Sequence, residues 1–350
     1  MEDISIYDEY GPIEGFAKFE DLPVMVITAV ARFNGRVKDI WEMIYLLPIT
    51  RIKIKKPSRP VKKIKLPWPG QAGLIMTAKL GPVNRGIFRS ITKGEWDNSI
   101  MIDISTSEKN INIKLSKDNI HMTGCKSIPM GVEAANLLID EINKVDRHID
   151  LMRDNMEEAV RVSNQLLDEG VGDLIFPENE PPYLKFSILN FHSHPEDDET
   201  AAALRGFFAS QLTDCLTYKD AVIKARWLTK RTEIITEPLV YNRLQPEMVK
   251  YRFNLGFQVN QDALEDLFTE IAPEFVVDYH PEIRNYVKIE LDCFSKIEGK
   301  NGIKKHTFSI QPSGQTNYSC PLIEEMSAVY YRFIYVINEI RDEIEVKTSL

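Results

Sequence analysis

The feature that most constrains the fold of this chain is a strand–turn–strand–helix pattern that occurs twice. In the first occurrence, residues 111–116 alternate apolar and polar side chains, which is typical of a strand with two different faces. Turn-forming residues follow at 117–119, and a second strand ends at Gly124, where the backbone can turn out of the sheet. Pro129 then begins an amphipathic helix.

The second occurrence spans residues 306–340. An alternating strand at 306–310 is followed by a turn at 312–314, and a second strand ends at Cys320. Pro321 then begins a helix with apolar residues at helical spacing. The two occurrences form an internal repeat of long period, which predicts two similar sheets, each with helices on one face.

This doubled pattern resembles the core of the TATA-box-binding protein family. Thr123-Gly124-Cys125-Lys126-Ser127 is similar to the family's Thr-Gly-Ala-Lys corner, and Ser319-Cys320-Pro321 is a more distant version of it. Residues 253–256 and 263–267 resemble the first strand and first helix of the family, and residues 279–283 the loop before its second strand. The resemblance covers roughly half of the chain, and its divergence is similar to that of the copies in large DNA viruses.

The resemblance implies an α/β (α+β) fold: a TATA-binding-protein-like saddle of two pseudo-symmetric repeats, each a curved antiparallel sheet backed by helices. We predict an acidic mobile tail, a first repeat with a basic insertion at 51–70, a linker with a strand–helix insertion, and a second repeat. Their respective bounds are 1–20, 21–170, 171–245 and 246–350.

Further elements are predicted from periodicity and from turn residues. Strands are expected at 23–33, 73–79, 86–91, 100–104 and 184–191. Helices are expected at 37–47, 151–167 and 199–212. Residues 221–235 have a mixed pattern that fits no single element.

The formal net charge of −9 is unfavourable for a generic nucleic-acid-binding protein, because lysine and arginine dominate affinity for phosphates. The charge is unevenly distributed, however, and residues 51–65 carry eight basic residues and no acidic one. This stretch is either a solvated loop or a phosphate-binding ribbon, in which the contacts would come from Lys55, Lys56, Lys62 and Lys63.

In the first repeat, the resemblance implies that the concave sheet face holds the minor groove of DNA and inserts apolar wedges between base steps. Leu115 corresponds to the third-strand wedge, and His121 and Thr123 to groove-facing residues. Trp96 is the large apolar residue nearest the second-strand wedge. We expect Leu115, His121 and Thr123 to be solvent-accessible; the alternative is that Leu115 belongs to the core, as most strand leucines do.

In the second repeat the correspondence is weaker. The third-strand wedge falls beside Ile310 and the second-strand wedge near Arg284. Asn317 and Ser319 correspond to groove contacts, and Asn254 lies near a groove asparagine of the family but out of register with it.

No paired spacing is found among the four cysteines, Cys125, Cys215, Cys293 and Cys320, so neither a zinc site nor a disulfide is predicted and no cofactor is expected. A separate segment, His192-Ser193-His194-Pro195-Glu196-Asp197-Asp198, resembles the metal signature of zinc deacetylases, in which His192 and His194 could bind zinc. The favoured alternative is an acidic loop that caps the helix beginning at Glu199.

The function implied by the resemblance is that of a transcription initiation factor that binds double-stranded promoter DNA and recruits a transcription factor B-type protein and RNA polymerase. No enzymatic reaction is expected. The first alternative is a saddle-shaped protein-interaction scaffold that has lost DNA binding. The second alternative is a zinc hydrolase built on the central insertion. No apolar run approaches the roughly 20 residues of a membrane span, so we expect a soluble intracellular protein at a site of transcription, either the nucleus or a viral factory or virion.

Overall fold

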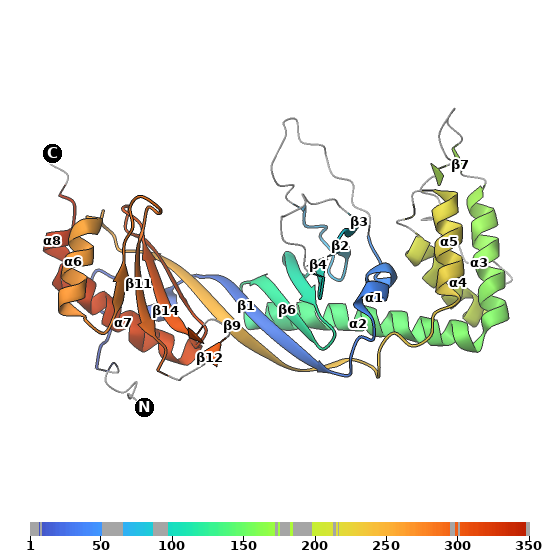
Figure 1. Cartoon of the computed structure of the whole chain (residues 1–350), viewed down its shortest axis with the longest axis horizontal. Coiled ribbons are helices and arrows are strands. Elements are labelled where there is room, and N and C mark those ends of the chain that lie inside the picture. The colour runs from blue at the N-terminus through green and yellow to red at the C-terminus, as the bar shows by residue number, and fades with distance from the viewer. Residues whose placement is uncertain are drawn as a thin grey trace. The chain divides into compact units, whose positions relative to one another are not determined.

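A computed structural model describes residues 7, 9–50, 66–86, 97–171, 174–175, 183–184, 198–212, 215, 217–294, 298–299 and 302–347. They form an α+β fold of helices and antiparallel strands, as the sequence predicts (Figure 1). The chain divides into two compact units, which are described separately. Unit 1 comprises residues 1–29, 124–128 and 245–350, and unit 2 comprises residues 30–123 and 129–244.

The strands of unit 1 lie in the order β10-β11-β14-β15-β9, and each is antiparallel to its neighbour. Their bounds are β9 (Val240–Asn254, whose first residues belong to unit 2), β10 (Val276–Asp278), β11 (Val287–Asp292), β14 (Lys305–Ile310) and β15 (Gln315–Cys320). The short strands β12 (Glu298–Gly299) and β13 (Gly302–Ile303) pair with each other. Gly314 closes the predicted turn with φ +77°, and a Cβ there would lie 2.1 Å from the Phe257 carbonyl oxygen, so only glycine fits.

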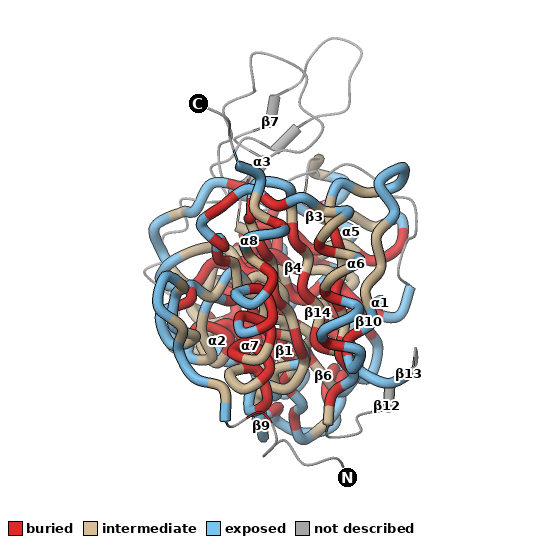
Figure 2. Tube along the Cα trace, turned by 90° about the vertical axis from the view of Figure 1, so that its left-hand side faces the viewer, coloured by how far each residue is buried: buried red, intermediate tan, exposed pale blue. Residues whose placement is uncertain are grey.

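The helices of unit 1 are α6 (Gln261–Ile271), α7 (Ile323–Glu339), α8 (Arg341–Ile344) and the 3₁₀ turn η2 (Phe19–Asp21). Helix α7 is the helix of the second repeat, and buried residues run along it (Figure 2). Its predicted apolar residues Phe333 and Ile337 are fully buried. Phe308 of β14 stacks on Phe333 with ring centroids 4.0 Å apart and on Tyr318 at 4.1 Å. An aromatic layer therefore joins this helix to the sheet.

The acidic N-terminal segment, predicted to be a mobile tail, has described residues that pack on unit 1. Tyr7 is buried, and the Phe19 ring lies 5.0 Å from that of Tyr251 and 5.6 Å from that of Tyr330. The Tyr330 hydroxyl donates a hydrogen bond of 2.7 Å to the Ala17 carbonyl oxygen. Residues from the two ends of the sequence thus share one core.

The strands of unit 2 lie in the order β6-β5-β4-β2-β3, again antiparallel. Their bounds are β2 (Ile75–Leu80), β3 (Val83–Gly86), β4 (Ile100–Ser105), β5 (Asn110–Leu115) and β6 (Asn119–Cys125). Strand β1 (Val24–Asn34) runs from residues of unit 1 into residues of unit 2. Each unit therefore contains the β-hairpin that the repeat predicts, β5–β6 in unit 2 and β14–β15 in unit 1.

The helices of unit 2 are α1 (Ile40–Leu46), α2 (Ile128–Asp154), α3 (Met156–Val171), α4 (Glu199–Leu212) and α5 (Tyr218–Leu228). Helix α2 buries Leu138, Ile139 and Ile142, as predicted. Helices α3, α4 and α5 pack together, and the buried Arg205 of α4 pairs with Glu169 of α3 at 3.0 Å. Helix α5 occupies part of the stretch that sequence periodicity did not assign. The short strands β7 (Leu174–Ile175) and β8 (Tyr183–Leu184) pair with each other.

Candidate functional site

One face of each sheet is built from buried apolar side chains, and the opposite face carries polar side chains. We call the latter the open face. In unit 1 the strand registers place on it alternate residues of four strands: Lys250, Arg252, Asn254, Lys288, Glu290, Asp292, Lys305, Thr307, Ser309, Gln315, Asn317 and Ser319. Most of them are half-buried, and they belong to the strands that also form the core.

Arg252 and Asn317 form the central polar pair of this open face. They lie directly opposite each other on β9 and β15, and the Arg252 Nε–H donates to the Asn317 Oδ1 at 3.0 Å. The Asn317 side-chain oxygen thus accepts a hydrogen bond from Arg252. The amide NH₂ of Asn317 and the outer guanidinium nitrogens of Arg252 are the donors that this pair can offer to a ligand. Within the part of the chain that the structure describes, neither Arg252 nor the neighbouring Lys250 is ion-paired with an acidic residue.

The outer strands of the same face differ, because their cations are paired with acids. Glu290 of β11 accepts from Lys288 and, at 3.4 Å, from Lys305. Asp278 pairs with Arg284, and the hydrogen bond from this guanidinium lowers the pKa of the Asp278 carboxyl. Among the described residues of this face, positive charge without an acidic partner is therefore concentrated on β9.

In unit 2 the open face contains two of the predicted groove residues. His121 lies opposite Lys114, and Thr123 opposite Asn112; all four are half-buried and share one face. Nearby, Asp103 accepts from Thr77 at 2.6 Å and from Asn112 at 3.2 Å. His121, Thr123, Lys114 and Asn112 form a polar surface of imidazole, hydroxyl, ammonium and amide groups, and the buried carboxylate of Asp103 lies beside it.

Leu115 is not on this surface, and the expectation that it is solvent-accessible is wrong. It is fully buried and pairs with the buried Ile120, one position away from the His121–Lys114 pair. Because side chains alternate along a strand, Leu115 points to the opposite face from His121 and Thr123. Its role in the core, the stated alternative, is confirmed.

The predicted residues of the second repeat are also divided between the two faces. Asn317 and Ser319 lie on the open face, whereas Ile310 is fully buried because it has the same parity as Phe308, and this corrects its placement as a groove contact. Asn254 is exposed at the end of β9, where its side-chain oxygen accepts from the Gly256 N–H at 2.8 Å. Arg284 lies outside the strands, in the loop before β11.

Several predicted site residues lie outside the described residues: Trp96, Lys55, Lys56, Lys62, Lys63, His192 and His194. Of the segment that resembles a zinc signature, Asp198 is described, and its Oδ1 accepts from the Ala201 N–H at 2.8 Å. This carboxylate caps helix α4, as the alternative interpretation predicted.

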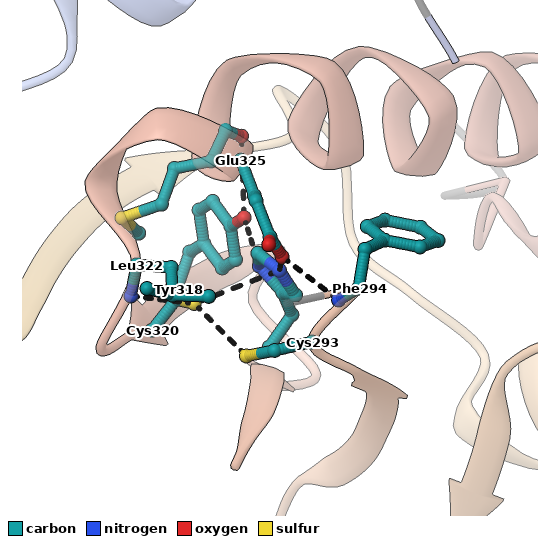
Figure 3. A network of polar contacts seen from close by, with 8 residues as sticks. Cys293, Phe294, Tyr318, Cys320, Leu322 and Glu325 are labelled. Atoms are coloured by element: carbon teal, nitrogen blue, oxygen red, sulfur yellow. Dashed lines mark hydrogen bonds and ion pairs between the residues drawn. The ribbon is translucent and has the colours of Figure 1, made fainter. Parts of the chain in front are cut away.

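A second candidate site lies in unit 1 and was not predicted from the sequence. Cys293, His306 and Cys320 are buried, with ligand atoms that all lie within 4.8 Å of one another (Figure 3). The two Sγ atoms are 3.6 Å apart, and Cys320 Sγ is 3.6 Å from the His306 Nε2. Glu325, also buried, has its Oε2 at 3.1 Å from the same Nε2.

The two thiols of this cluster have different pKa values. The hydrogen bond from Cys320, together with His306, lowers the pKa of the Cys293 thiol to about 6. Burial raises the pKa of the Cys320 thiol. The arrangement therefore favours Cys293 as the thiolate of the pair.

No protein-family model matches the chain, and no curated protein matches its sequence. Among solved structures, the chain is similar to a TBP from Methanococcus jannaschii, with a TM-score of 0.36, 9% sequence identity, and coverage of 91% of this chain and 99% of that chain. At this level of similarity no residue role is transferred from that protein.

None of the helices in the described ranges combines the length and apolar character needed to cross a bilayer.

The group of Cys293, His306 and Cys320, which we call the thiol cluster, is weakly indicated by the sequence. His306 occupies a buried position in the series His306, Phe308, Ile310, and Cys320 ends the series Thr316, Tyr318, Cys320. A histidine and a cysteine that occupy apolar, alternating positions of two adjacent strands point to the same face of the sheet. This would have indicated that they meet in the core.

Proposed function

We propose that this chain binds double-stranded DNA through the open faces of its sheets, in the manner of a TATA-box-binding protein: a saddle of two pseudo-symmetric repeats that contacts the minor groove. The observation that carries the proposal is the Arg252–Asn317 pair, which presents hydrogen-bond donors on a sheet face without a neutralising acid among the described residues. The proposal involves no chemical reaction.

The chemistry of the donors selects the groove and the base pairs. In the minor groove, A·T pairs present only acceptors, the adenine N3 and the thymine O2, whereas G·C pairs add the guanine amino donor. The free donors of Arg252 and Asn317 complement the A·T pattern and would oppose the guanine amino group. Lys250, on the same strand as Arg252, would contact phosphate oxygens.

The open face of unit 2 would add contacts of the same kind through His121, Thr123 and Lys114. Because Leu115 and Ile310 are buried, neither can serve as a wedge between base steps. We therefore expect weaker kinking of the duplex than an intercalating wedge would produce. DNA held in this way would be presented to a transcription factor B-type protein and to RNA polymerase, which are the partners that the sequence resemblance implies.

Fluorescence anisotropy with an A·T-rich duplex and a G·C-rich duplex tests the proposal. The double variant Arg252→Ala/Asn317→Ala should lose about 1–3 kcal/mol of binding to the A·T-rich duplex, which is roughly five- to 150-fold in affinity. Lys219→Ala, an exposed lysine on α5, is the control and should bind as the parent does. Equal binding by the parent and the double variant would contradict the proposal.

Salt dependence tests the basic stretch separately. Replacing Lys55, Lys56, Lys62 and Lys63 by alanine should weaken binding to both duplexes alike. It should also reduce the slope of log K against log salt by up to about four units. An unchanged slope would assign this stretch to another partner or to solvent.

A second candidate function is supported by the acids of unit 1. Glu290 and Asp292 together balance the charges of Lys288 and Lys305, and Asp278 balances that of Arg284, so the outer strands of this open face carry little free positive charge. A face of this kind suits a protein partner with mixed charge, as in a scaffold that has lost DNA binding. Absence of saturable DNA binding at low salt would favour this function.

A further inference from the structure

Three buried side chains with metal-binding atoms converge in unit 1, and the carboxylate of Glu325 lies beside one of them. Cys293 follows β11, His306 lies in β14, Cys320 ends β15, and Glu325 lies in the first turn of α7. The register explains the meeting, because Leu291 pairs with His306 and Thr307 pairs with Ser319. His306 and the two cysteines are therefore brought to the same end of three adjacent strands.

The distances within this thiol cluster match those between the ligands of a tetrahedral zinc ion. Zinc–sulfur and zinc–nitrogen bonds of about 2.3 and 2.05 Å place two sulfur ligands roughly 3.8 Å apart and a sulfur and a nitrogen roughly 3.6 Å apart. The observed separations are 3.6 Å for the two Sγ atoms and 3.6 Å for Cys320 Sγ and His306 Nε2. Glu325 Oε2 lies 3.1 Å from Nε2 and accepts a hydrogen bond from the Phe294 N–H at 3.0 Å, so this carboxylate is a neighbour of the three ligand atoms.

The surrounding hydrogen bonds orient these atoms as a metal site requires. The Tyr318 hydroxyl donates to the Met326 carbonyl oxygen at 3.2 Å, so its oxygen is available to accept from the His306 Nδ1–H at 2.8 Å. In this tautomer the Nε2 of a neutral imidazole keeps its lone pair, which a metal ion beside Cys320 would accept. The Leu322 N–H donates to Cys320 Sγ at 3.3 Å, which stabilises a thiolate.

We propose that Cys293, His306 and Cys320 bind one Zn²⁺ ion in a buried structural site, with the Glu325 carboxylate beside it. Two thiolates and an imidazole form a borderline-soft ligand set that suits zinc and excludes magnesium and calcium. The three ligands and Glu325 are buried, so a substrate has no access to the ion. The ion would fasten the ends of β11, β14 and β15 together, independently of whether the open face binds DNA.

A disulfide between Cys293 and Cys320 is the competing use of the same thiols. It would require the two Sγ atoms, now 3.6 Å apart, to approach to about 2.05 Å. It would leave His306 and Glu325 as a buried pair without a metal. The two alternatives differ in mass, in thiol count and in metal content.

The test uses the full-length protein, produced without a polyhistidine tag and purified under reducing conditions. Elemental analysis should find one zinc per chain, and Cys293→Ser and Cys320→Ser should each lose it. Cys215→Ser, a cysteine outside the cluster, should retain one zinc. Tyr318→Phe keeps all three ligands and should bind zinc roughly 10- to 100-fold more weakly, because it removes the acceptor that orients His306.

A second measurement covers the case in which the cysteine variants fail to fold. Cobalt(II) added to the parent protein after zinc removal should give the visible bands of a tetrahedral site and thiolate-to-cobalt charge-transfer absorption. Either result overturns the proposal: a parent protein that takes up neither zinc nor cobalt, or an intact mass lower by two hydrogens, which shows a disulfide. Because neither measurement involves DNA, failure of the DNA-binding proposal would leave the zinc site unaffected.

Discussion

The two units contain the same hairpin-and-helix pattern but fill its core with different chemistry. In unit 2, Ile113 of β5 pairs with Met122 of β6, and the buried positions around them are aliphatic. In unit 1, the corresponding pair is Phe308 and Tyr318, whose rings stack, with His306 and Cys320 one pleat further along. An aliphatic core needs only apolar volume, whereas the core of unit 1 also requires that each buried polar atom has a partner.

The largest effect is expected from Leu115→Glu, which tests whether the hairpin core of unit 2 is purely aliphatic. Leu115 is fully buried in the aliphatic core, so a carboxylate there would have no partner, and unit 2 should unfold. Hydrogen exchange followed by mass spectrometry should show loss of protection in β5 and β6. Leu115→Met, which conserves volume, should cost less than about 1.5 kcal/mol. A folded Leu115→Glu protein with normal protection would place Leu115 on the open face after all.

The aromatic core should be as sensitive to lost volume as the aliphatic one. Phe333→Ala removes the ring that stacks on Phe308 and should cost about 3–5 kcal/mol, whereas Leu138→Ala in α2 should cost about 2–5 kcal/mol. Chemical denaturation of the two variants measures both. A cost for Phe333→Ala below about 1 kcal/mol would show that the aromatic layer is loosely packed.

Tyr318→Phe isolates the polar requirement of unit 1. It keeps the ring stack but removes the hydroxyl that accepts from His306 and donates to Met326, so it should cost about 1–3 kcal/mol. Met122→Leu at the corresponding position of unit 2 is the matched control and should cost less than about 1.5 kcal/mol. Equal stability of Tyr318→Phe and the parent would mean that water or another group satisfies His306 and Met326.

The smallest effect is expected on the open face. Thr123→Ala alters a half-buried strand residue outside the core, and the free energy of unfolding should change by no more than about 0.5 kcal/mol. Thermal unfolding checks this value. A larger loss would indicate that the open face of unit 2 is packed against something in the folded protein.

Alternation and turn chemistry predicted both hairpins and their following helices, because these signals are local in the sequence. Alternation does not state which of two faces is covered, and the face of Leu115 was therefore misassigned. The spacing of Leu115 and Thr123 crosses a turn, where the register adds or removes a residue. Only the pairing of Leu115 with Ile120 in the folded sheet decides which face Leu115 occupies.

The thiol cluster could not be derived from sequence spacing. Cys293 follows β11, His306 lies in β14 and Cys320 ends β15, and segments of different length separate the three residues. Short paired spacings arise when two ligands share one turn, and here no two of the cluster residues do. Their convergence is a property of strand order and register, which require the folded sheet.

The packing of Phe19 and Ala17 on α7 has a consequence for synthesis of the chain. The Phe19 N–H donates to the Tyr331 hydroxyl across 312 positions of sequence. At about 5–20 residues per second, the N-terminal segment leaves the ribosome roughly 15–60 s before that partner has been made. Unit 2 lies between the two ends and can fold during this interval, so the unit that contains the first residue is the last that can be completed.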